Sequence, residues 1–240
     1  NSLLYLGNIY YYGGYGVEKD YVKAVKYYEM SKKYFFSEAV INLGYIYFYG
    51  GYGIQKNYEK ARECFESAAD VFDSDSRFIL GLFYEKGYGV KQDYSEALKH
   101  YKIAAKQKNS KAFLHLGNFY YFGKGIPIDV LRAKYYYELS AQDNNSDAFL
   151  MLGVIYCSGD GVEIDFNKGK EYFELSASQN NSEALFLLGM MYLTGIPINK
   201  DFTRAKSYFE LSAQLNNVRA LNILGLLYEN GNDVEKDFVK

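Results

Sequence analysis

The sequence holds few of the residues that cross-link a chain or interrupt its regular structure. Its 240 residues include two cysteines, two prolines and no tryptophan. Two cysteines cannot form a disulfide framework, and two prolines exclude a proline-rich linker or a collagen-like segment. No apolar run reaches the roughly 18 residues that a membrane-spanning helix needs. The first residues also lack the basic segment and apolar stretch of a signal peptide, so none is expected here.

Neither sign of charge is in excess. Lysine and arginine together number 27 against 29 aspartates and glutamates, which gives a formal net charge of −2. A nearly neutral chain has no global attraction to nucleic acid or to an anionic membrane, so we expect neither a nucleic-acid partner nor membrane insertion. Hydrophobic residues make up 49% and charged residues 23%, the balance of a folded globular chain rather than a disordered one.

Motifs of known chemistry are also missing. The sequence contains no Gly-x-Ser-x-Gly, no His-Glu-x-x-His, no P-loop and no Cys-x-x-Cys. Its Gly-Tyr-Gly-Val loops match half of a dinucleotide-binding fingerprint, but they follow expected helices instead of strands and recur along the chain, so a structural role is favoured. We therefore expect no catalytic residues, no cofactor and no metal site.

What the sequence does contain is an internal repeat, and its signature is a Leu-Gly pair. The glycines of these pairs are spaced by 37, 37, 36, 36, 36 and 36 residues. A tyrosine follows each glycine by three residues, a second glycine follows by six, and a small residue precedes by five. The seven glycines of the pairs are Gly7, Gly44, Gly81, Gly117, Gly153, Gly189 and Gly225. The glycines six positions later are Gly13, Gly50, Gly87, Gly123, Gly159, Gly195 and Gly231.

The second half of each repeat is equally regular. It begins at an Asp or Asn, and a small residue follows four positions later, an aromatic-rich pair at seven and eight, and small residues near eleven and twelve. The Asp and Asn positions are Asp20, Asn57, Asp93, Asp129, Asp165, Asp201 and Asp237.

These offsets predict two helices per repeat. Spacings of three and four place the small residue, Leu and Tyr of the first half on one helical stripe. The later glycine suits a left-handed C-terminal cap. The Asp or Asn suits an N-cap of the second helix, and Glu96, three residues after Asp93, predicts a capping box. Because nothing alternates with period two, no strands are expected.

The glycine of the Leu-Gly pair falls inside the first helix, where glycine costs roughly 1 kcal/mol relative to alanine. We expect close approach of the second helix to offset this cost, with an aromatic ring above the missing side chain. The tyrosines are interpreted as packing residues that keep the hydroxyl near water.

The pattern resembles the Sel1-like repeat family, relatives of the tetratricopeptide repeat, whose motif reads approximately A-x-x-x-L-G-x-x-Y-x-x-G-x-G-V-x-x-D-x-x-K-A-x-x-Y-Y-x-x-A-A. Residues 112–141 follow this motif nearly position by position. Repeats 1 and 2 depart from it by one extra loop residue, repeat 6 has Pro197 for a loop glycine, and the junction at 32–36 lacks the small ending.

The resemblance implies an all-α fold, a right-handed α-solenoid of stacked antiparallel helix pairs with six complete repeats and a partial seventh. The expected repeats, within a single solenoid over residues 1–240, are approximately 2–38, 39–75, 76–111, 112–147, 148–183, 184–219 and 220–240. Polar capping repeats are expected at solenoid ends, and neither end shows one. We therefore expect the chain to be part of a longer array or a larger protein.

The histidines and cysteines are assigned to packing. His100 stands at an aromatic position of a second helix, whereas His115 stands at a variable position of a first helix and is expected to be exposed. Cys64 and Cys157 are expected to be buried, unreactive thiols in a reducing compartment.

In related solenoids the first helix of each repeat lines the concave face, and the resemblance implies the same here. Three positions per first helix, at −2, +1 and +5 from the Leu-Gly glycine, share this face. They mix aromatic and amide groups in repeats 1, 2 and 4, which suits a peptide groove, and are apolar in repeats 5 to 7. The partner-binding candidates are Tyr5, Asn8, Tyr12, Asn42, Tyr45, Tyr49, Leu82, Lys86, His115, Asn118, Phe122, Met151 and Met190.

A large exposed apolar strip usually marks a partner or self-association surface, so self-association through the C-terminal repeats is one expectation. Burial of this strip within a tightly curved solenoid is the alternative.

We expect a non-catalytic scaffold or adaptor that binds protein or peptide partners along the concave face, a common role of similar proteins. The two unpaired cysteines favour a cytoplasmic setting. One alternative is an adaptor of degradation in the lumen of the endoplasmic reticulum, weakly supported by glycosylation sequons at Asn144 and Asn180. Another is the regulatory or targeting region of an enzyme, such as a protein kinase, that is encoded elsewhere.

Overall fold

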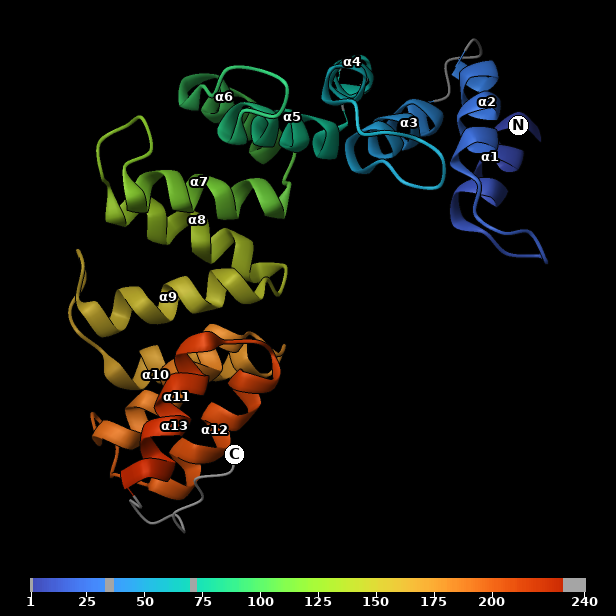
Figure 1. The fold of residues 1–240 in the computed structure, drawn as a ribbon. Helices are drawn as coiled ribbons and strands as arrows, with labels where there is room; N and C mark the ends of the chain where they lie inside the picture. The colour runs from blue at the N-terminus through green and yellow to red at the C-terminus, as the bar shows by residue number, and fades with distance from the viewer. Residues whose placement is uncertain (1, 33–36, 70–72, 231–240) are drawn as a thin grey trace. The chain divides into compact units, whose positions relative to one another are not determined.

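The computed structural model describes residues 2–32, 37–69 and 73–230, which form thirteen α-helices (Figure 1). Helices A, which carry the Leu-Gly pairs, are α1 (Ser2–Tyr12), α3 (Ser37–Tyr49), α5 (Ser74–Lys86), α7 (Ser110–Phe122), α9 (Ser146–Ser158), α11 (Ser182–Thr194) and α13 (Val218–Asn230). Helices B are α2 (Tyr21–Lys32), α4 (Tyr58–Ala69), α6 (Tyr94–Lys106), α8 (Val130–Gln142), α10 (Phe166–Ala177) and α12 (Phe202–Gln214). In the described residues there is no strand, only isolated bridges at Gly14–Val17 and Gly51–Ile54. The predicted all-α solenoid of helix pairs is confirmed.

The chain divides into two compact units, residues 1–116 (unit 1) and residues 117–240 (unit 2). In unit 1 the helices α1 to α6 pack in chain order, each against its neighbours in the sequence. In unit 2 the helices α8 to α13 pack in the same way. Chain neighbours are therefore spatial neighbours, as expected of a repeat array.

Helices B begin at the predicted caps. The side chains of these Asp and Asn residues accept hydrogen bonds from backbone amides of the first turn, at 2.8–3.0 Å: Asp20, Asn57, Asp93, Asp129, Asp165 and Asp201. Asp237 lies outside the described residues. The reciprocal half of the predicted capping box is not seen in the described part of the chain, because the carboxylate of Glu96 pairs with Lys99 at 2.5 Å instead.

Helices A end at the predicted glycines, whose φ angles of 65° to 75° lie in the left-handed region. Gly231, the seventh of them, lies outside the described residues, as does most of the irregular junction at 32–36. The starts of helices A carry a second set of caps that the sequence analysis did not identify. Their side chains accept hydrogen bonds from amides at the start of the helix that follows: Asp73, Asn109, Asn145, Asn181 and Asn217.

The two sequons lie in the turns before these caps. Asn144 and Asn180 are exposed and have φ angles of 58° and 59°. The predicted exposure of this turn is confirmed.

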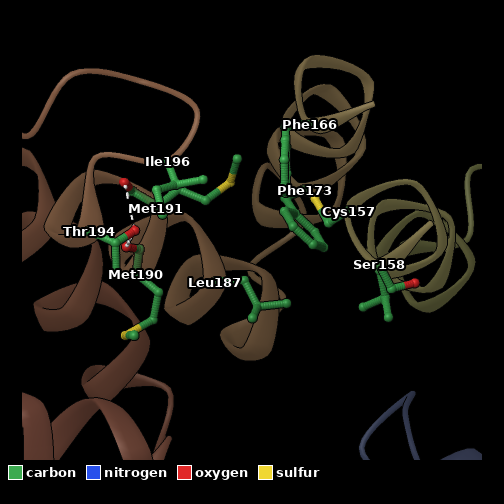
Figure 2. Close-up of a pocket in the computed structure, with 10 residues that line it drawn as sticks. Cys157, Ser158, Phe166, Phe173, Leu187, Met190, Met191, Thr194 and Ile196 are labelled. Atoms are coloured by element: carbon green, nitrogen blue, oxygen red, sulfur yellow. Dashed lines mark hydrogen bonds between the residues drawn. The ribbon is translucent and has the colours of Figure 1, made fainter. Parts of the chain in front are cut away.

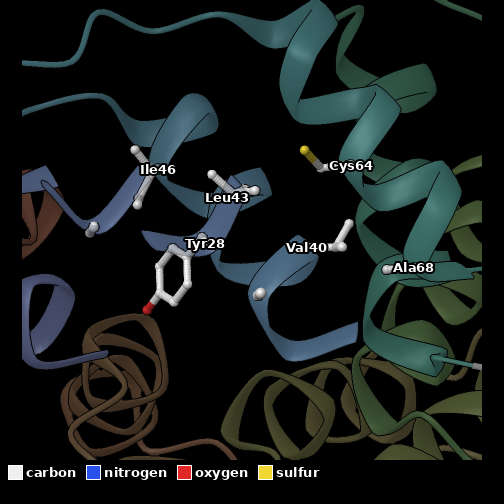
Figure 3. Packing of buried hydrophobic residues seen from close by; sticks show 8 residues of the cluster. Tyr28, Val40, Leu43, Ile46, Cys64 and Ala68 are labelled. Atoms are coloured by element: carbon white, nitrogen blue, oxygen red, sulfur yellow. The ribbon is translucent and has the colours of Figure 1, made fainter. Parts of the chain in front are cut away.

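The mid-helix glycines lie directly beneath rings of helix B, as predicted. A Cβ atom added at Gly7, Gly44, Gly81, Gly117, Gly153 or Gly189 would lie closer than 3.0 Å to the ring of a Tyr or Phe. Those rings belong to Tyr28, Phe65, Tyr101, Tyr137, Phe173 and Phe209, which are all nearly or fully buried. Figure 3 shows one such core, in which Tyr28 of α2 packs near Leu43 and Ile46 of α3.

In five repeats a second ring of helix B stacks on the tyrosine that follows the mid-helix glycine. The stacked pairs have ring centroids 5.5–5.8 Å apart and nearly parallel planes: Tyr10–Tyr27, Tyr84–His100, Tyr120–Tyr136, Tyr156–Tyr172 and Tyr192–Tyr208. His100 replaces a tyrosine in one of these pairs, and burial lowers the pKa of its ring. Its predicted packing role is confirmed.

Candidate functional site

The candidate partner-binding residues lie on helices A of both units. Unit 1 carries Tyr5, Asn8 and Tyr12 on α1, Asn42, Tyr45 and Tyr49 on α3, Leu82 and Lys86 on α5, and His115 on α7. Unit 2 carries Asn118 and Phe122 on α7, Met151 on α9 and Met190 on α11. Some of these side chains are exposed to solvent, whereas others are bonded to neighbouring helices inside the chain.

Unit 1 presents a surface of tyrosines, which we call the tyrosine surface: Tyr5, Tyr12, Tyr45 and Tyr49. Tyr5, Tyr12 and Tyr49 are 57%, 61% and 62% exposed, and Tyr45 is half-buried. The rings of Tyr45 and Tyr49 stack with centroids 6.2 Å apart. Tyr12 contacts Tyr11 edge to face at 4.8 Å. Large rings held by their neighbours lose little side-chain freedom on binding, which suits a recognition surface.

The tyrosine surface is continuous with half-buried hydroxyls beside it. Burial raises the pKa of Tyr11 to about 12, with smaller effects of Tyr21, Tyr12, Tyr45 and Tyr49. Burial likewise raises the pKa of Tyr45 to about 12. Both residues are therefore neutral hydrogen-bonding groups at physiological pH.

Asn8 and Asn42 are not free on this surface. The Tyr28 hydroxyl donates to Asn8 Oδ1 at 2.7 Å, and Asn42 Nδ2 donates to the Tyr28 oxygen at 3.1 Å. Asn8 Nδ2 donates to Glu38 at 2.9 Å. Asn42 is only 6% exposed, so its amide joins repeats 1 and 2 together. Spacing along one helix could not show this, because the acceptors come from other helices.

His115 differs most from its expectation. Its imidazole is half-buried, and its Nδ1 lies 2.9 Å from Oε2 of Glu85. The Tyr101 hydroxyl donates to the same oxygen at 2.6 Å, and Lys86 Nζ lies 3.3 Å from Oε1. The expected exposure of His115 was wrong, because a buried carboxylate from the preceding repeat draws the ring inward.

Glu85 was not among the candidate residues, although its place in the repeat carries a signal. Glu85 is 2% exposed and stands four residues after a mid-helix glycine, where repeats 1, 2 and 4 have Tyr11, Phe48 and Tyr121. A carboxylate at a position that is aromatic in other repeats needs partners, and Tyr101 and His115 supply them.

Asn118 repeats the bond made by Asn8. The Tyr137 hydroxyl donates to Asn118 Oδ1 at 2.8 Å. The expectation that these tyrosine hydroxyls stay near water was wrong for Tyr28, Tyr101 and Tyr137, whose hydroxyls bind acceptors inside the chain. Phe122, in contrast, is 56% exposed and free to contact a partner.

Unit 2 contains an apolar cavity of about 380 Å³ beside α9, α10 and α11 (Figure 2). Met190 lines it, whereas the half-buried Met151 is not among its lining residues. The predicted apolar strip is thus neither fully buried nor flat. The lining residues are Val154, Cys157, Ser158, Phe166, Phe173, Leu187, Met190, Met191, Thr194 and Ile196.

The two cysteines differ in their surroundings. Cys64 is 5% exposed, which confirms its predicted burial, and this burial raises the pKa of its thiol to about 11. Cys157 is half-buried at the cavity, so its predicted burial was only partly correct. Burial raises the pKa of the Cys157 thiol as well.

A comparison with models of protein families shows which family the chain is related to. A model described as Sel1 repeat matches residues 1–33, 37–70, 74–109, 111–145, 146–181, 182–217 and 218–240. The chain belongs to the Sel1 repeat family. Sel1 repeat proteins are commonly protein-interaction scaffolds. No curated protein matches the chain.

Several solved structures share the fold. A Sel1 repeat protein from Oxalobacter formigenes is 28% identical over 98% of this chain and 94% of its own, with a TM-score of 0.89. A protective antigen of uropathogenic Escherichia coli, described as having an SLR fold, is 30% identical over 99% of this chain, with a TM-score of 0.83. The chain spans about half of that antigen, 50%. An immunity protein of Pseudomonas aeruginosa, 19% identical over 89% of this chain and 80% of its own, with a TM-score of 0.56, shares the fold alone.

None of the described helices combines the length and apolar character that crossing a membrane requires.

Proposed function

We propose that this chain is a non-catalytic adaptor that binds polypeptide partners through helices A, with the tyrosine surface of unit 1 as a principal contact. The observation that carries the proposal is the exposure of Tyr5, Tyr12 and Tyr49 beside the half-buried Tyr45. Exposed aromatic residues grouped on one surface are typical of partner-binding sites.

The chemistry of the tyrosine surface favours a polypeptide. Tyrosine offers an apolar ring together with a hydroxyl that both donates and accepts. Such a surface can pack against apolar side chains while it binds peptide carbonyl and amide groups.

The test is a selection of random 12-residue peptides against the wild-type chain, with affinities measured by fluorescence anisotropy. We expect Tyr12→Ala combined with Tyr49→Ala to weaken the selected peptides at least tenfold, because each truncation removes an exposed ring. Tyr135→Ala is the matched control, since Tyr135 is 56% exposed on α8 in unit 2. Circular dichroism should show unchanged helicity in both variants.

Two results would overturn the proposal. One is the failure of any peptide to be selected. The other is equal weakening by the tyrosine pair and by the control.

A further inference from the structure

The cavity of unit 2 lies where unit 1 has a ring of its own. In α3, Phe48 stands four residues after the mid-helix glycine, and its ring contacts Tyr58, Phe83 and Tyr88 with centroids 5.3–5.5 Å apart. The same repeat position in α9 is occupied by Cys157. A thiol fills far less space than a phenyl ring.

The residues around this position correspond one to one. The positions of Tyr58, Phe83 and Tyr88 are taken in unit 2 by Phe166, Met191 and Ile196. All three line the cavity together with Cys157. The cavity is therefore the place of the Phe48 ring, left unfilled by the shorter side chain.

The thiol of Cys157 packs closely against α10. A Cβ atom added at Gly169 of α10 would collide with Sγ of Cys157, so the sulfur packs closely over this glycine. The other helices B have alanine at the equivalent position, as in Ala61 and Ala133. Gly169 thus accommodates the sulfur beside α10, and the apolar walls beyond it stay open.

The walls offer few hydrogen bonds to an occupant. None of the described lining residues is charged. Ser158 donates to the backbone oxygen of Ile155 at 3.3 Å, and Thr194 donates to that of Met190 at 2.8 Å. A polar group placed in the cavity would lose hydration with little replacement, whereas an apolar ring would lose no hydrogen bond.

The volume of the cavity and the flexibility of its methionine side chains both suit an aromatic ring. An apolar cavity of about 150 Å³ is sufficient to bind benzene, so about 380 Å³ holds a phenyl ring with the methylene that attaches it. Met190 and Met191 can adjust their shape to it, because methionine side chains are flexible and polarizable.

We propose that this cavity receives a phenylalanine side chain of a bound polypeptide, which takes the place that Phe48 fills in unit 1. The inference rests on the proposed function, because it names a residue of the polypeptide partner. Phenylalanine fits better than tyrosine, since the walls are almost entirely apolar.

Two variants of one residue test the proposal with the selected peptides as probes. Cys157→Phe fills the cavity from within and should lower peptide affinity by roughly 10- to 100-fold, the effect of losing one buried ring. Cys157→Ala leaves the cavity open, so its peptide affinity should be clearly higher than that of Cys157→Phe. In the peptides, selection should enrich phenylalanine at one position, and Phe→Ala there should cause a similar loss.

A second readout needs no variant. Iodoacetamide should alkylate Cys157 of the wild-type chain more slowly when a selected peptide is bound, as followed by mass spectrometry. Cys64, which is 5% exposed, serves as the unreactive reference in the same sample.

The outcomes separate the two proposals. Peptides that bind without phenylalanine enrichment, that leave Cys157 alkylation unchanged and that tolerate Cys157→Phe overturn the cavity proposal while the adaptor function stands. Failure to select any peptide overturns both.

Discussion

Gly117 and Gly225 occupy the same position in α7 and α13, but a methyl group added at each would meet different surroundings. At Gly117 the added carbon would lie 2.5 Å from the ring of Tyr137. At Gly225 no atom of the described residues lies within 4 Å. Close packing, and not a conformational need for glycine, therefore explains the residue at Gly117, because a helix interior otherwise favours alanine.

This difference predicts opposite effects of one substitution. We expect Gly117→Ala to lower the free energy of unfolding by about 1–3 kcal/mol through overpacking. Gly225→Ala should raise it by up to about 1 kcal/mol, since alanine is the better helix former. Urea denaturation followed by circular dichroism would compare them. Equal effects at the two sites would contradict the packing explanation.

Also at the residue scale, hydroxyl groups on helix B match acceptors on helix A. Tyr28 and Tyr137 donate to Asn8 and Asn118, one position after the mid-helix glycine. Where helix B carries Phe209 instead, that position holds Met190. Where that position holds Leu82, the Tyr101 hydroxyl donates to Glu85 instead, because a buried hydroxyl without an acceptor is costly.

Introducing a Tyr–Asn pair at Phe209 and Met190 tests whether a buried tyrosine hydroxyl needs this acceptor. Phe209→Tyr alone should lower the free energy of unfolding by about 1–3 kcal/mol, the cost of an unsatisfied buried hydroxyl. Adding Met190→Asn should recover part of this loss, because the new amide oxygen accepts the bond. A double-mutant cycle in urea measures the coupling, and a coupling energy near zero would contradict this requirement.

At the scale of helices, the starts of helices A do two tasks at once. Asn181 caps α11 by accepting from the amides of Glu183 and Ala184, and its own Nδ2 donates to Asp147 of α9 at 2.9 Å. Asn109 and Asn217 make equivalent bonds to Asp75 and Glu183. These three caps therefore also join α7, α11 and α13 to the preceding helix A.

Two substitutions at one cap separate these tasks. Asn181→Ala removes both and should lower the free energy of unfolding by about 1–2 kcal/mol. Asn181→Ser keeps a capping oxygen but loses the amide donor to Asp147, so its effect should be smaller. Thermal unfolding followed by circular dichroism ranks the two variants. Equal melting temperatures for the wild type and Asn181→Ala would show that the cap adds no stability.

Over the whole molecule, stability is a sum over neighbouring helices, as in other repeat proteins, and aromatic rings supply much of each contact. Because some of the tyrosine hydroxyls are partly buried, the stability of the chain should depend on pH in the alkaline range. Burial raises the pKa of Tyr11 and of Tyr45 from 10.0 to about 12. The unfolded chain loses these protons first, so the stabilisation is complete below about pH 10 and is lost as the pH rises towards 12.

We therefore expect the urea midpoint to be steady between pH 8 and 9 and to fall between pH 10 and 12. Tyr11→Phe removes one of the shifted groups and should make this fall less steep. Circular dichroism at fixed ionic strength provides the measurement. A midpoint that stays constant up to pH 12 would contradict the assigned burial of these hydroxyls.

Five features could be predicted from the amino-acid sequence alone: the repeat, the helix pairs, the caps of helices B, the C-terminal glycines of helices A and the close approach of rings to Gly7 and its equivalents. Each of these depends on spacings within one repeat, and local geometry fixes them. The tertiary structure decided which side chains are free. Asn42 and His115 are turned inward by Tyr28 and Glu85, which come from other helices. The cavity beside Cys157 is likewise set by side chains of three helices, because space and hydrogen-bond partners arise only when separate helices pack together.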